Sequence, residues 1–479
     1  MLFNSIDFAI FLPIVFAIYW FVVNKNNTIR NGFIVIASYF FYACWDWRFL
    51  ILILFSTVTD YAVGLYLKKI STQRKRKVLL AVSIVVNLSF LGFFKYCNFF
   101  IENFIDLFCL FGSKLNIHTL QIILPVGISF YTFQTISYTI DVYRKKIEAT
   151  DNFLAFAAFV SFFPQILAGP IERAANLLPQ FYTRPTFDYS KAVDGVRQIL
   201  WGLFKKVVIA DTCAIFVNPI FEQSYTLSGS TLAIGVVLFS FQIYGDFSGY
   251  SDIAIGTARL FGISLRQNFA YPNFSRSVAE FWRRWHISLS SWFKDYLYIP
   301  IGGSRGNLWM RIRNTFIIFL VSGFWHGADW TFVCWGGINA IYMIPSVIRK
   351  TNRKNLDIVA QNKRLPSWQE LGNVLVTFIL ITFSRIFFRS ENILQAIHYI
   401  KNIFSASFFE KVSIIPSTTL IFLILFFTVV EWIGREQKHG LEQFGLKWKK
   451  WVRWLFYFIL GILIFAFSGN AQEFFYFQF

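Results

Sequence analysis

An ionisable pair stands inside one of the most hydrophobic stretches of the chain, FLVSGFWHGADWTFVCWGG. His326 and Asp329 lie there among bulky apolar residues, and Gly323 and Gly327 flank the histidine. An ionisable group in a lipid bilayer is costly unless it finds a partner or a wet cavity. A neutral imidazole could take the proton of an attacking hydroxyl, an effect worth about 10²–10⁴-fold in rate. His326 is therefore a candidate general base, and a structural, hydrogen-bonded histidine is the equal alternative.

A second group of candidates lies in YPNFSRSVAEFWRRWHISLSSWFKDYLYIPIGG. On a helix over Phe281–Lys294 the aromatic residues share one side, and Arg283, Arg284 and Lys294 lie on the other. His286 falls at the edge of the aromatic side. This pattern predicts a helix in the plane of the membrane interface, with the basic residues at the entrance for an anionic donor. Breakers flank this helix on both sides: Asn268, Pro272, Asn273, Pro300, Gly302 and Gly303.

Two carboxylates, Asp246 and Asp252, also stand in apolar surroundings, in FQIYGDFSGYSDIAIG. Six residues apart, they do not share a helix face, so a paired-carboxylate mechanism is not indicated. We expect them to make hydrogen bonds at helix ends, and Gly245 and Gly249 to mark a break or close helix packing. The alternative is that both act with His326 and Asp329 as coupling groups of a transporter.

The remaining histidines and the cysteines carry weaker signals. His118, His398 and His439 lie in polar contexts and are expected to be solvated. The five cysteines stand singly, without CxxC spacing, which predicts buried thiols and neither a metal site nor a disulfide framework. Cys334 could carry an acyl group as a nucleophile, but no basic residue is placed to activate it.

The elements that must position these residues are membrane helices. Hydrophobic residues make up 56% of the 479, and charged residues only 15%, well below the share of about 25% in soluble domains. The apolar runs predict an all-α, multipass transmembrane bundle with about eleven to thirteen membrane segments, some of them re-entrant or interfacial. We expect one membrane-embedded domain over residues 1–479. Its chemistry should lie within about 90–345, where polar, glycine and proline residues mix with apolar ones.

Basic loops suggest the orientation of the first spans. The N-terminal segment lacks the basic region and cleavage site of a signal peptide, so we expect it to stay as the first span. The loops NKNNTIR, KKISTQRKRK and YRKK are expected in the cytoplasm, which places the N-terminus outside. We attribute the net charge of +19 to basic cytoplasmic loops rather than to nucleic-acid binding. The alternative is that part of this charge forms a surface for an acidic partner or a phosphorylated donor.

Five segments, taken together, resemble the successive motifs of the membrane-bound O-acyltransferase family, in particular its bacterial branch for alginate and peptidoglycan O-acetylation. They are LPVGISFYTFQTISYTIDVYR, SFFPQILAGPIER, YGDFSGYSDIAIG, the WRRWH segment and SGFWHGADWTFVCWG. The resemblance implies helices around a funnel or tunnel, with His326 as catalytic residue and His286 as second, supporting histidine. The terminal FFYFQF resembles the aromatic ending of this branch, a possible partner contact. Asn339 departs from the branch, which often has a histidine there, so a helper role at this position is in doubt.

The expected function is O-acyl transfer, of acetyl groups above all, to an exported polysaccharide or cell-wall glycan. The donor would be acetyl-CoA or an acyl carrier protein thioester, with no tightly bound cofactor and no metal. An extracytoplasmic partner protein could complete the transfer, with this chain only passing the acyl group through the membrane. The expected location is the bacterial cytoplasmic (inner) membrane. The alternative is a transporter or flippase, although no internal repeat is visible.

Overall fold

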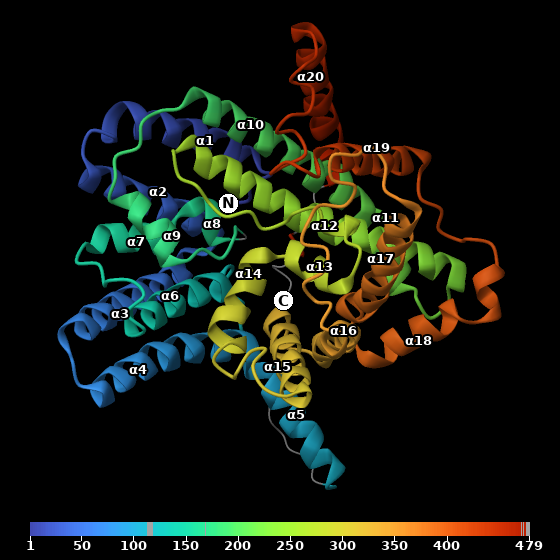
Figure 1. Cartoon of the computed structure of the whole chain (residues 1–479), viewed down its shortest axis with the longest axis horizontal. Helices are drawn as coiled ribbons and strands as arrows, with labels where there is room; N and C mark the ends of the chain where they lie inside the picture. The colour runs from blue at the N-terminus through green and yellow to red at the C-terminus, as the bar shows by residue number, and fades with distance from the viewer. Residues whose placement is uncertain (113–117, 168, 471, 473, 476–479) are drawn as a thin grey trace. The chain divides into compact units, whose positions relative to one another are not determined.

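A computed structural model describes residues 1–112, 118–167, 169–470, 472 and 474–475. Within these residues every regular element is a helix and no strand occurs, so the all-α prediction is confirmed (Figure 1). The chain divides into two units. The first holds Met1–Ala192 with Thr257–Arg266, and the second holds Val193–Gly256 and the chain from Gln267 onward. All candidate catalytic residues fall in the second unit.

The first unit consists of membrane-type helices and short connecting turns. Its α-helices are α1 (Ile6–Ala17), α2 (Asn27–Asp46), α3 (Leu50–Lys69), α4 (Gln73–Leu91), α5 (Cys97–Leu110), α6 (Ile128–Tyr143), α7 (Phe153–Ser161), α8 (Phe163–Ile166), α9 (Ala174–Leu177) and the start of α10 (Tyr189–Leu203). Shorter π or 3₁₀ pieces are η1 (Ile18–Val23), η2 (Trp47–Phe49), η3 (Gly92–Tyr96) and η4 (Leu178–Phe181).

The second unit carries the longest helix and the hairpin that ends in His326. After α10 come η5 (Phe204–Ala210), α11 (Asp211–Glu222), α12 (Gly229–Leu260), η6 (Pro272–Phe274), α13 (Val278–Arg284), α14 (Ile287–Phe293), η7 (Lys294–Tyr298), α15 (Leu308–His326) and α16 (Trp330–Ile348). They are followed by α17 (Trp368–Arg389), α18 (Ile393–Ile403), η8 (Ala406–Phe409), α19 (Thr418–Gly434), α20 (Lys450–Phe467) and η9 (Ser468–Asn470). The last four residues of α12 belong to the first unit.

Seven stretches among the described residues are long and apolar enough to cross a membrane: Ile6–Val23, Asn27–Lys69, Gln73–Leu110, Gly229–Leu260, Trp330–Ile348, Trp368–Arg389 and Lys450–Phe467. Two shorter apolar helices, Phe153–Ile166 and Thr418–Gly434, accompany them. The larger number expected from the sequence included short or polar runs. One of them, residues 199–216, forms the end of α10, η5 and part of α11, with Lys205 and Lys206 buried inside it.

The helices α15 and α16 form a closely packed antiparallel hairpin because glycines line their contact (Figure 1). A Cβ on Gly323 would lie 2.2 Å from the carbonyl oxygen of Phe332, and one on Gly336 would lie 2.3 Å from that of Phe319. Both distances are far below van der Waals contact, so only glycine allows the two backbones to approach this closely. Close approach of a second backbone therefore accounts for Gly323, one of the two glycines that flank His326.

The turn between α15 and α16 fixes the place of His326. The histidine is the last residue of α15, and Gly327 continues in an extended conformation. Asp329 is the N-cap of α16, where its Oδ1 accepts a hydrogen bond of 2.7 Å from the backbone N–H of Thr331. A carboxylate at a helix N-terminus satisfies a free backbone donor and is stabilised by the helix dipole. Asp329 therefore has a structural role at the end of the hairpin.

One predicted element is wrong. The single helix over Phe281–Lys294 is instead two short helices, α13 and α14, that meet at His286 in the left-handed conformation, with φ +44° and ψ +55°. Helical periodicity continues through the break, so the pattern does not reveal it. The aromatic side is not an interfacial surface, because Phe281, Trp285 and Trp292 are buried in the second unit. The helix breakers predicted after residue 294 are confirmed. Pro300 leads into a turn in which Gly302 and Gly303 have positive φ.

Candidate active site

His326 lies in a cage of aromatic rings at the end of α15. Its side chain is buried, with 3% of the residue exposed. The imidazole centroid lies 5.0 Å from the ring of Trp325, 5.2 Å from Trp335 and 5.4 Å from Phe388. These three rings come from α15, α16 and α17. Aromatic walls around one imidazole keep bulk water away from it, as the chemistry of an activated ester requires.

His286 is also buried, between α13 and α14, with 1% of the residue exposed. Burial lowers its pKa from 6.5 to about 3, so the imidazole is neutral at physiological pH. Its ring packs edge-on against Phe247 of α12 at 4.6 Å, and its Nδ1 lies 3.1 Å from Oδ1 of Asn268. The prediction that His286 lies at an exposed interface edge is wrong, because the break in the helix turns its side chain into the core.

The indole of Trp325 contacts both histidines. Its ring centroid lies 6.2 Å from that of His286 and 5.0 Å from that of His326. The two residues are 40 positions apart in the sequence, yet they share one aromatic neighbour in the second unit. The structure therefore brings both sequence-predicted histidines into a single site.

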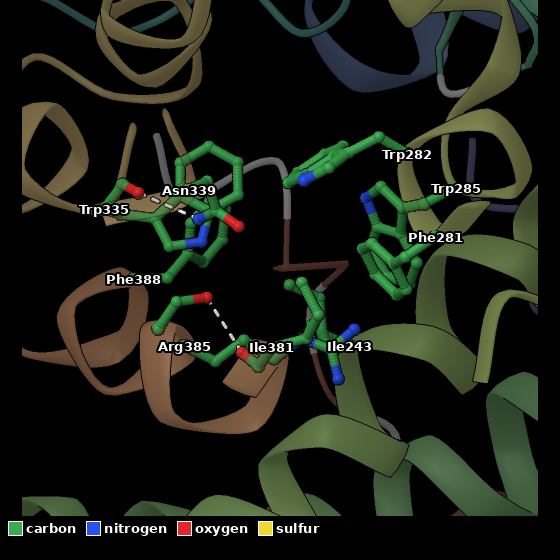
Figure 2. A pocket seen from close by; sticks show the side chains of 10 residues that line it. Ile243, Phe281, Trp282, Trp285, Trp335, Asn339, Ile381, Arg385 and Phe388 are labelled. Atoms are coloured by element: carbon green, nitrogen blue, oxygen red, sulfur yellow. Dashed lines mark hydrogen bonds between the residues drawn. The ribbon is translucent and has the colours of Figure 1, made fainter. Parts of the chain in front are cut away.

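A small cavity, the aromatic cavity, lies one ring away from His326 (Figure 2). About 10 Å³ of it is open to a water-sized molecule, which is room for roughly one water. Trp335 and Phe388 form part of its wall and also contact the His326 ring. Its lining residues are Ile243, Phe281, Trp282, Trp285, Trp335, Asn339, Ile381, Ser384, Arg385 and Phe388.

Polar atoms face one another across the aromatic cavity. Asn339 donates from Nδ2 to the backbone oxygen of Trp335 at 2.8 Å, while its buried Oδ1 has no hydrogen-bond partner within the described part of the chain. The buried indole N–H of Trp282 likewise has none among those residues. Figure 2 shows the two side chains on opposite sides of the cavity, and the guanidinium of Arg385 lies 5.0 Å above the Trp285 ring. The cavity thus offers a hydrogen-bond donor, an acceptor and a cation to a small polar group.

A second, wider cavity is lined by basic residues, and we call it the basic cavity. About 520 Å³ of it is open to a water-sized molecule. Four cations and two carboxylates are among its lining residues: Arg283, Arg284, Arg435, Lys438, Glu436 and Glu442. Two of the three residues predicted at a donor entrance, Arg283 and Arg284, therefore lie together here. The third, Lys294, is exposed at the start of η7 and is not among the residues that line it.

The two arginines also hold the loop after α16. Arg283 donates to the backbone oxygens of Asn352, Lys354 and Asn355 at 2.6–2.9 Å. Arg284 donates to the backbone oxygen of Asp357 at 2.8 Å and forms an ion pair with Glu280 of its own helix. The sequence predicted their positive charge but not this anchoring of a loop about 70 residues away, because no local pattern records it.

A narrow space, the central cavity, shares lining residues with the basic cavity and is also lined by a hydrogen-bond partner of His286. About 10 Å³ of it is open to a water-sized molecule. Gln267, Tyr271 and Lys438 line both this cavity and the basic one. Asn268, which is hydrogen-bonded to His286, lines the central cavity as well. Polar residues thus lead from the basic cavity to the buried histidine.

The predicted helix-end role of Asp246 and Asp252 is wrong. Both lie inside the long helix α12 and form buried ion pairs with adjacent lysines of η5. Lys206 Nζ lies 2.7 Å from Asp246, and Lys205 Nζ lies 2.6 Å from Asp252. The glycines of this segment do mark close packing, since a Cβ on Gly249 would lie 2.7 Å from a backbone oxygen of α10. Both buried carboxylates are therefore matched by a cation.

Other sequence predictions are only partly met. His118 is exposed and His398 is half-buried against Tyr225, but His439 is buried and its Nε2 lies 2.9 Å from Asp194.

Of the cysteines only Cys213 is buried, so the prediction of buried thiols is wrong for the others, which lie on partly or fully exposed helix faces. A polar or apolar neighbourhood in sequence does not determine which face of a helix is covered.

The C-terminal aromatic residues reach the site from far along the chain. Phe474 and Phe475 are buried, and the Phe475 ring stacks on Phe388 of the His326 cage at 5.9 Å. The backbone N–H of Phe475 donates to Asp246 at 2.8 Å. Residues 476–479, the rest of the predicted partner contact, lie outside the described part of the chain.

The sequence predicted no functional role for Phe388, Arg385 or Asn268. Arg385 could have been noticed as a cation within an apolar run, whereas Asn268 was expected only to break a helix.

The second unit thus holds one buried histidine at the tip of a glycine-packed hairpin and a second buried histidine that shares its neighbour Trp325. The sequence pattern of the membrane-bound O-acyltransferase family matches residues 144–388, and the chain belongs to this family. It is therefore a membrane-bound acyltransferase.

Relatives of this chain are named for acyl transfer to alginate, peptidoglycan and teichoic acid. It is 38% identical over 409 residues to the probable alginate O-acetylase AlgI of Pseudomonas aeruginosa, covering 85% of this chain and 75% of that protein. It is 36% identical over 430 residues to the peptidoglycan O-acetyltransferase of Helicobacter pylori, covering 84% and 79%. It is 29% identical over 281 residues to the teichoic acid D-alanyltransferase of Streptococcus thermophilus, covering 55% and 68%.

Proposed function

We propose that this enzyme transfers an acetyl group from a cytoplasmic thioester to a hydroxyl of an exported polysaccharide or cell-wall glycan, directly or through an extracytoplasmic partner protein. The donor is acetyl-CoA or an acetylated acyl carrier protein. The observation that carries the proposal is the buried, ring-enclosed position of His326 in a chain whose relatives are named for O-acetylation.

His326 serves as general base in this proposal. Its imidazole takes the proton of the acceptor hydroxyl while the hydroxyl oxygen attacks the thioester carbonyl carbon. The new C–O bond forms, the C–S bond breaks, and the leaving thiolate receives the proton from the imidazolium. The rings of Trp325, Trp335 and Phe388 exclude water, which would otherwise hydrolyse the thioester.

The basic cavity is proposed as the donor entrance. Its four cations suit the phosphates of coenzyme A or the acidic surface of a carrier protein. The small aromatic cavity suits a two-carbon acyl group better than a long chain, since it has room for about one water. Basic loops place the enzyme in the cytoplasmic membrane with its N-terminus outside, which accessibility labelling from either side of the membrane checks.

A transfer assay separates this proposal from the transporter alternative. Membrane vesicles that contain the enzyme receive labelled acetyl-CoA or acetylated carrier protein together with surface glycan of the host. We expect label in the glycan as an alkali-labile ester, with no requirement for a proton gradient. Gradient-dependent uptake of label without ester formation would support the transporter instead and refute the proposal.

Arg283→Gln is expected to raise the KM for the donor by about 10-fold or more and to change kcat little. The substitution removes a charged hydrogen-bond donor of the basic cavity, worth about 1.5–3 kcal/mol. Initial rates at varied donor concentration measure the effect. Lys294→Gln is the matched control, because Lys294 lies outside this cavity and its loss should leave KM unchanged. Equal effects of both substitutions would show that charge in general, rather than this cavity, binds the donor.

Asn339→Leu is expected to lower the transfer rate by up to about 10-fold and to lower the stability only slightly. It removes the acceptor that Asn339 offers to the aromatic cavity, and one hydrogen bond contributes about 0.5–1.5 kcal/mol. That acceptor has no partner within the described chain, so the fall in melting temperature should not exceed what the lost bond from Nδ2 to the backbone oxygen of Trp335 contributes. Transfer rates and thermal unfolding in detergent measure the two effects. A full transfer rate would exclude the aromatic cavity from the reaction.

A further inference from the structure

Asn268 has an unusual position for a residue without an assigned role. It lies in the segment between α12 and η6, and its side chain is fully buried. Its Oδ1 is 3.1 Å from Nδ1 of His286, 2.9 Å from the hydroxyl of Ser288 and 3.3 Å from the backbone nitrogen of Ser288. Its Nδ2 donates to the hydroxyl of Ser251 at 3.0 Å. Every polar atom of the amide is therefore engaged.

These contacts fix which atom of the amide faces His286. The backbone N–H of Ser288 can only donate, so the Asn268 atom that faces it must be the oxygen. The same oxygen faces Nδ1 of His286, and an oxygen of this kind only accepts. Nδ1 must therefore carry the hydrogen, and in a neutral imidazole Nε2 is then the acceptor.

We propose that Asn268 is a positioning residue, which holds His286 as the neutral Nδ1–H tautomer and so presents Nε2 as a hydrogen-bond acceptor to a reactant. The assignment of a reactant rests on the proposed acyl transfer. The tautomer itself rests only on the hydrogen bonds around Asn268. Candidate reactant protons are those of the acceptor hydroxyl and of an amide on the arm of the donor.

The backbone around His286 is held as firmly as its side chain. A left-handed conformation is costly for a residue other than glycine and persists only where neighbours enforce it. Two backbone hydrogen bonds do so: Ile287 N–H donates to the oxygen of Asn268 at 2.9 Å, and Ala270 N–H donates to that of Arg284 at 3.0 Å. Asn268 thus holds this turn twice, with its main-chain oxygen on the N–H of Ile287 and its side-chain oxygen beside Nδ1 of His286. An orientation secured in this way is typical of functional sites.

The surroundings of the ring favour the neutral form. Phe247, Phe269 and Trp325 contact the imidazole, and its polar contacts include the amide of Asn268 and the hydroxyl of Ser288. Titratable groups face Asn268 across the central cavity: Lys205, Asp252, Glu431, Lys438, His439, Tyr244 and Tyr271. Lys205 is paired with Asp252 at 2.6 Å and with Glu431 at 3.6 Å, and Lys438 adds a second cation, so two lysines stand against two carboxylates around this cavity.

Nitrogen-15 solid-state NMR of the full chain in lipid tests the tautomer directly. The protein is labelled at its histidines, and the His286 signals are those lost in His286→Gln. We expect a protonated Nδ1 and a bare Nε2 for His286 at both pH 7 and pH 5. A protonated Nε2 with a bare Nδ1, or an imidazolium at pH 7, would overturn the proposal.

Asn268→Asp supplies the second measurement. The carboxylate keeps an acceptor beside Nδ1 but adds a negative charge, which favours the imidazolium and raises the pKa of His286 by about 1–3 units. We expect His286 to protonate at higher pH than in the unaltered enzyme, and the acidic limb of the transfer rate to move upward with it. An unmoved protonation curve would show that Asn268 does not act on the ring.

Ser288→Ala is the matched control. It removes one hydroxyl that donates to the same oxygen but leaves the backbone N–H of Ser288 and adds no charge. The tautomer of His286 should therefore stay unchanged. The NMR measurement needs no substrate, so a result that contradicts the proposed tautomer of His286 would leave the proposed role of His326 intact. Absence of acyl transfer likewise leaves the NMR result standing.

Discussion

His326→Ala is expected to abolish acyl transfer, with a loss of at least about 10²–10⁴-fold in rate. The substitution removes the one imidazole that the aromatic cage encloses, and none of Trp325, Trp335 and Phe388 can accept a proton. Labelled acetyl transferred into surface glycans measures the effect in cells that lack the native gene. The amount of protein in the membrane shows whether the variant still inserts.

His118→Ala is the control for this substitution, since His118 is exposed and lies in the first unit. It should keep full activity. His326→Gln retains much of the volume of the side chain and separates the loss of a base from the loss of packing. Acetylation that persists in both His326 variants would remove the proposed mechanism.

Gly336→Ala is expected to disrupt the α15–α16 hairpin. The new methyl group would lie 2.3 Å from the backbone oxygen of Phe319, and a backbone atom of a packed helix can move only if the helices separate. Overpacking of this kind typically costs about 1–3 kcal/mol, sometimes more. Since His326 ends one helix of this hairpin, its ring would leave the cage as well. We expect a lower melting temperature in detergent and a large loss of transfer.

Gly337→Ala provides a control one residue further along the same helix. There the nearest atom to a new Cβ is a terminal carbon of Leu320, at an ordinary distance of 3.7 Å. Alanine also has a higher helix propensity than glycine, by about 1 kcal/mol. The variant should be as stable as the unaltered enzyme or slightly more so. Equal damage from both alanines would mean that the close contact at Gly336 does not hold the hairpin.

The transporter alternative is weakened because its candidate carboxylates have structural partners. Asp246 and Asp252 face Lys206 and Lys205 inside the protein, and Asp329 caps α16. We therefore propose a chemical role for the two buried histidines and a structural one for these carboxylates.

Much of the chemistry could be predicted from the sequence alone. Length and hydropathy determine a helical membrane protein, because only helices or closed barrels satisfy backbone groups in lipid. The isolation of His326 in an apolar run, and the glycines beside it, also mark the centre of the site. These features are local: they depend on residue type and short spacing, which the sequence shows directly.

Only the tertiary structure determines how the site is assembled. The aromatic periodicity of residues 281–294 predicts one helix, but long-range hydrogen bonds from Asn268 and Ala270 enforce a break at His286. The ring of Trp325 then joins two histidines that are 40 residues apart in sequence. Periodicity describes the preferences of one segment, whereas the left-handed turn, the ion pairs of α12 and the cage around His326 depend on contacts between distant segments. For this reason the sequence identifies His326 as the candidate catalytic residue, and the packing of the second unit determines the rings around it and the hydrogen-bond partner of His286.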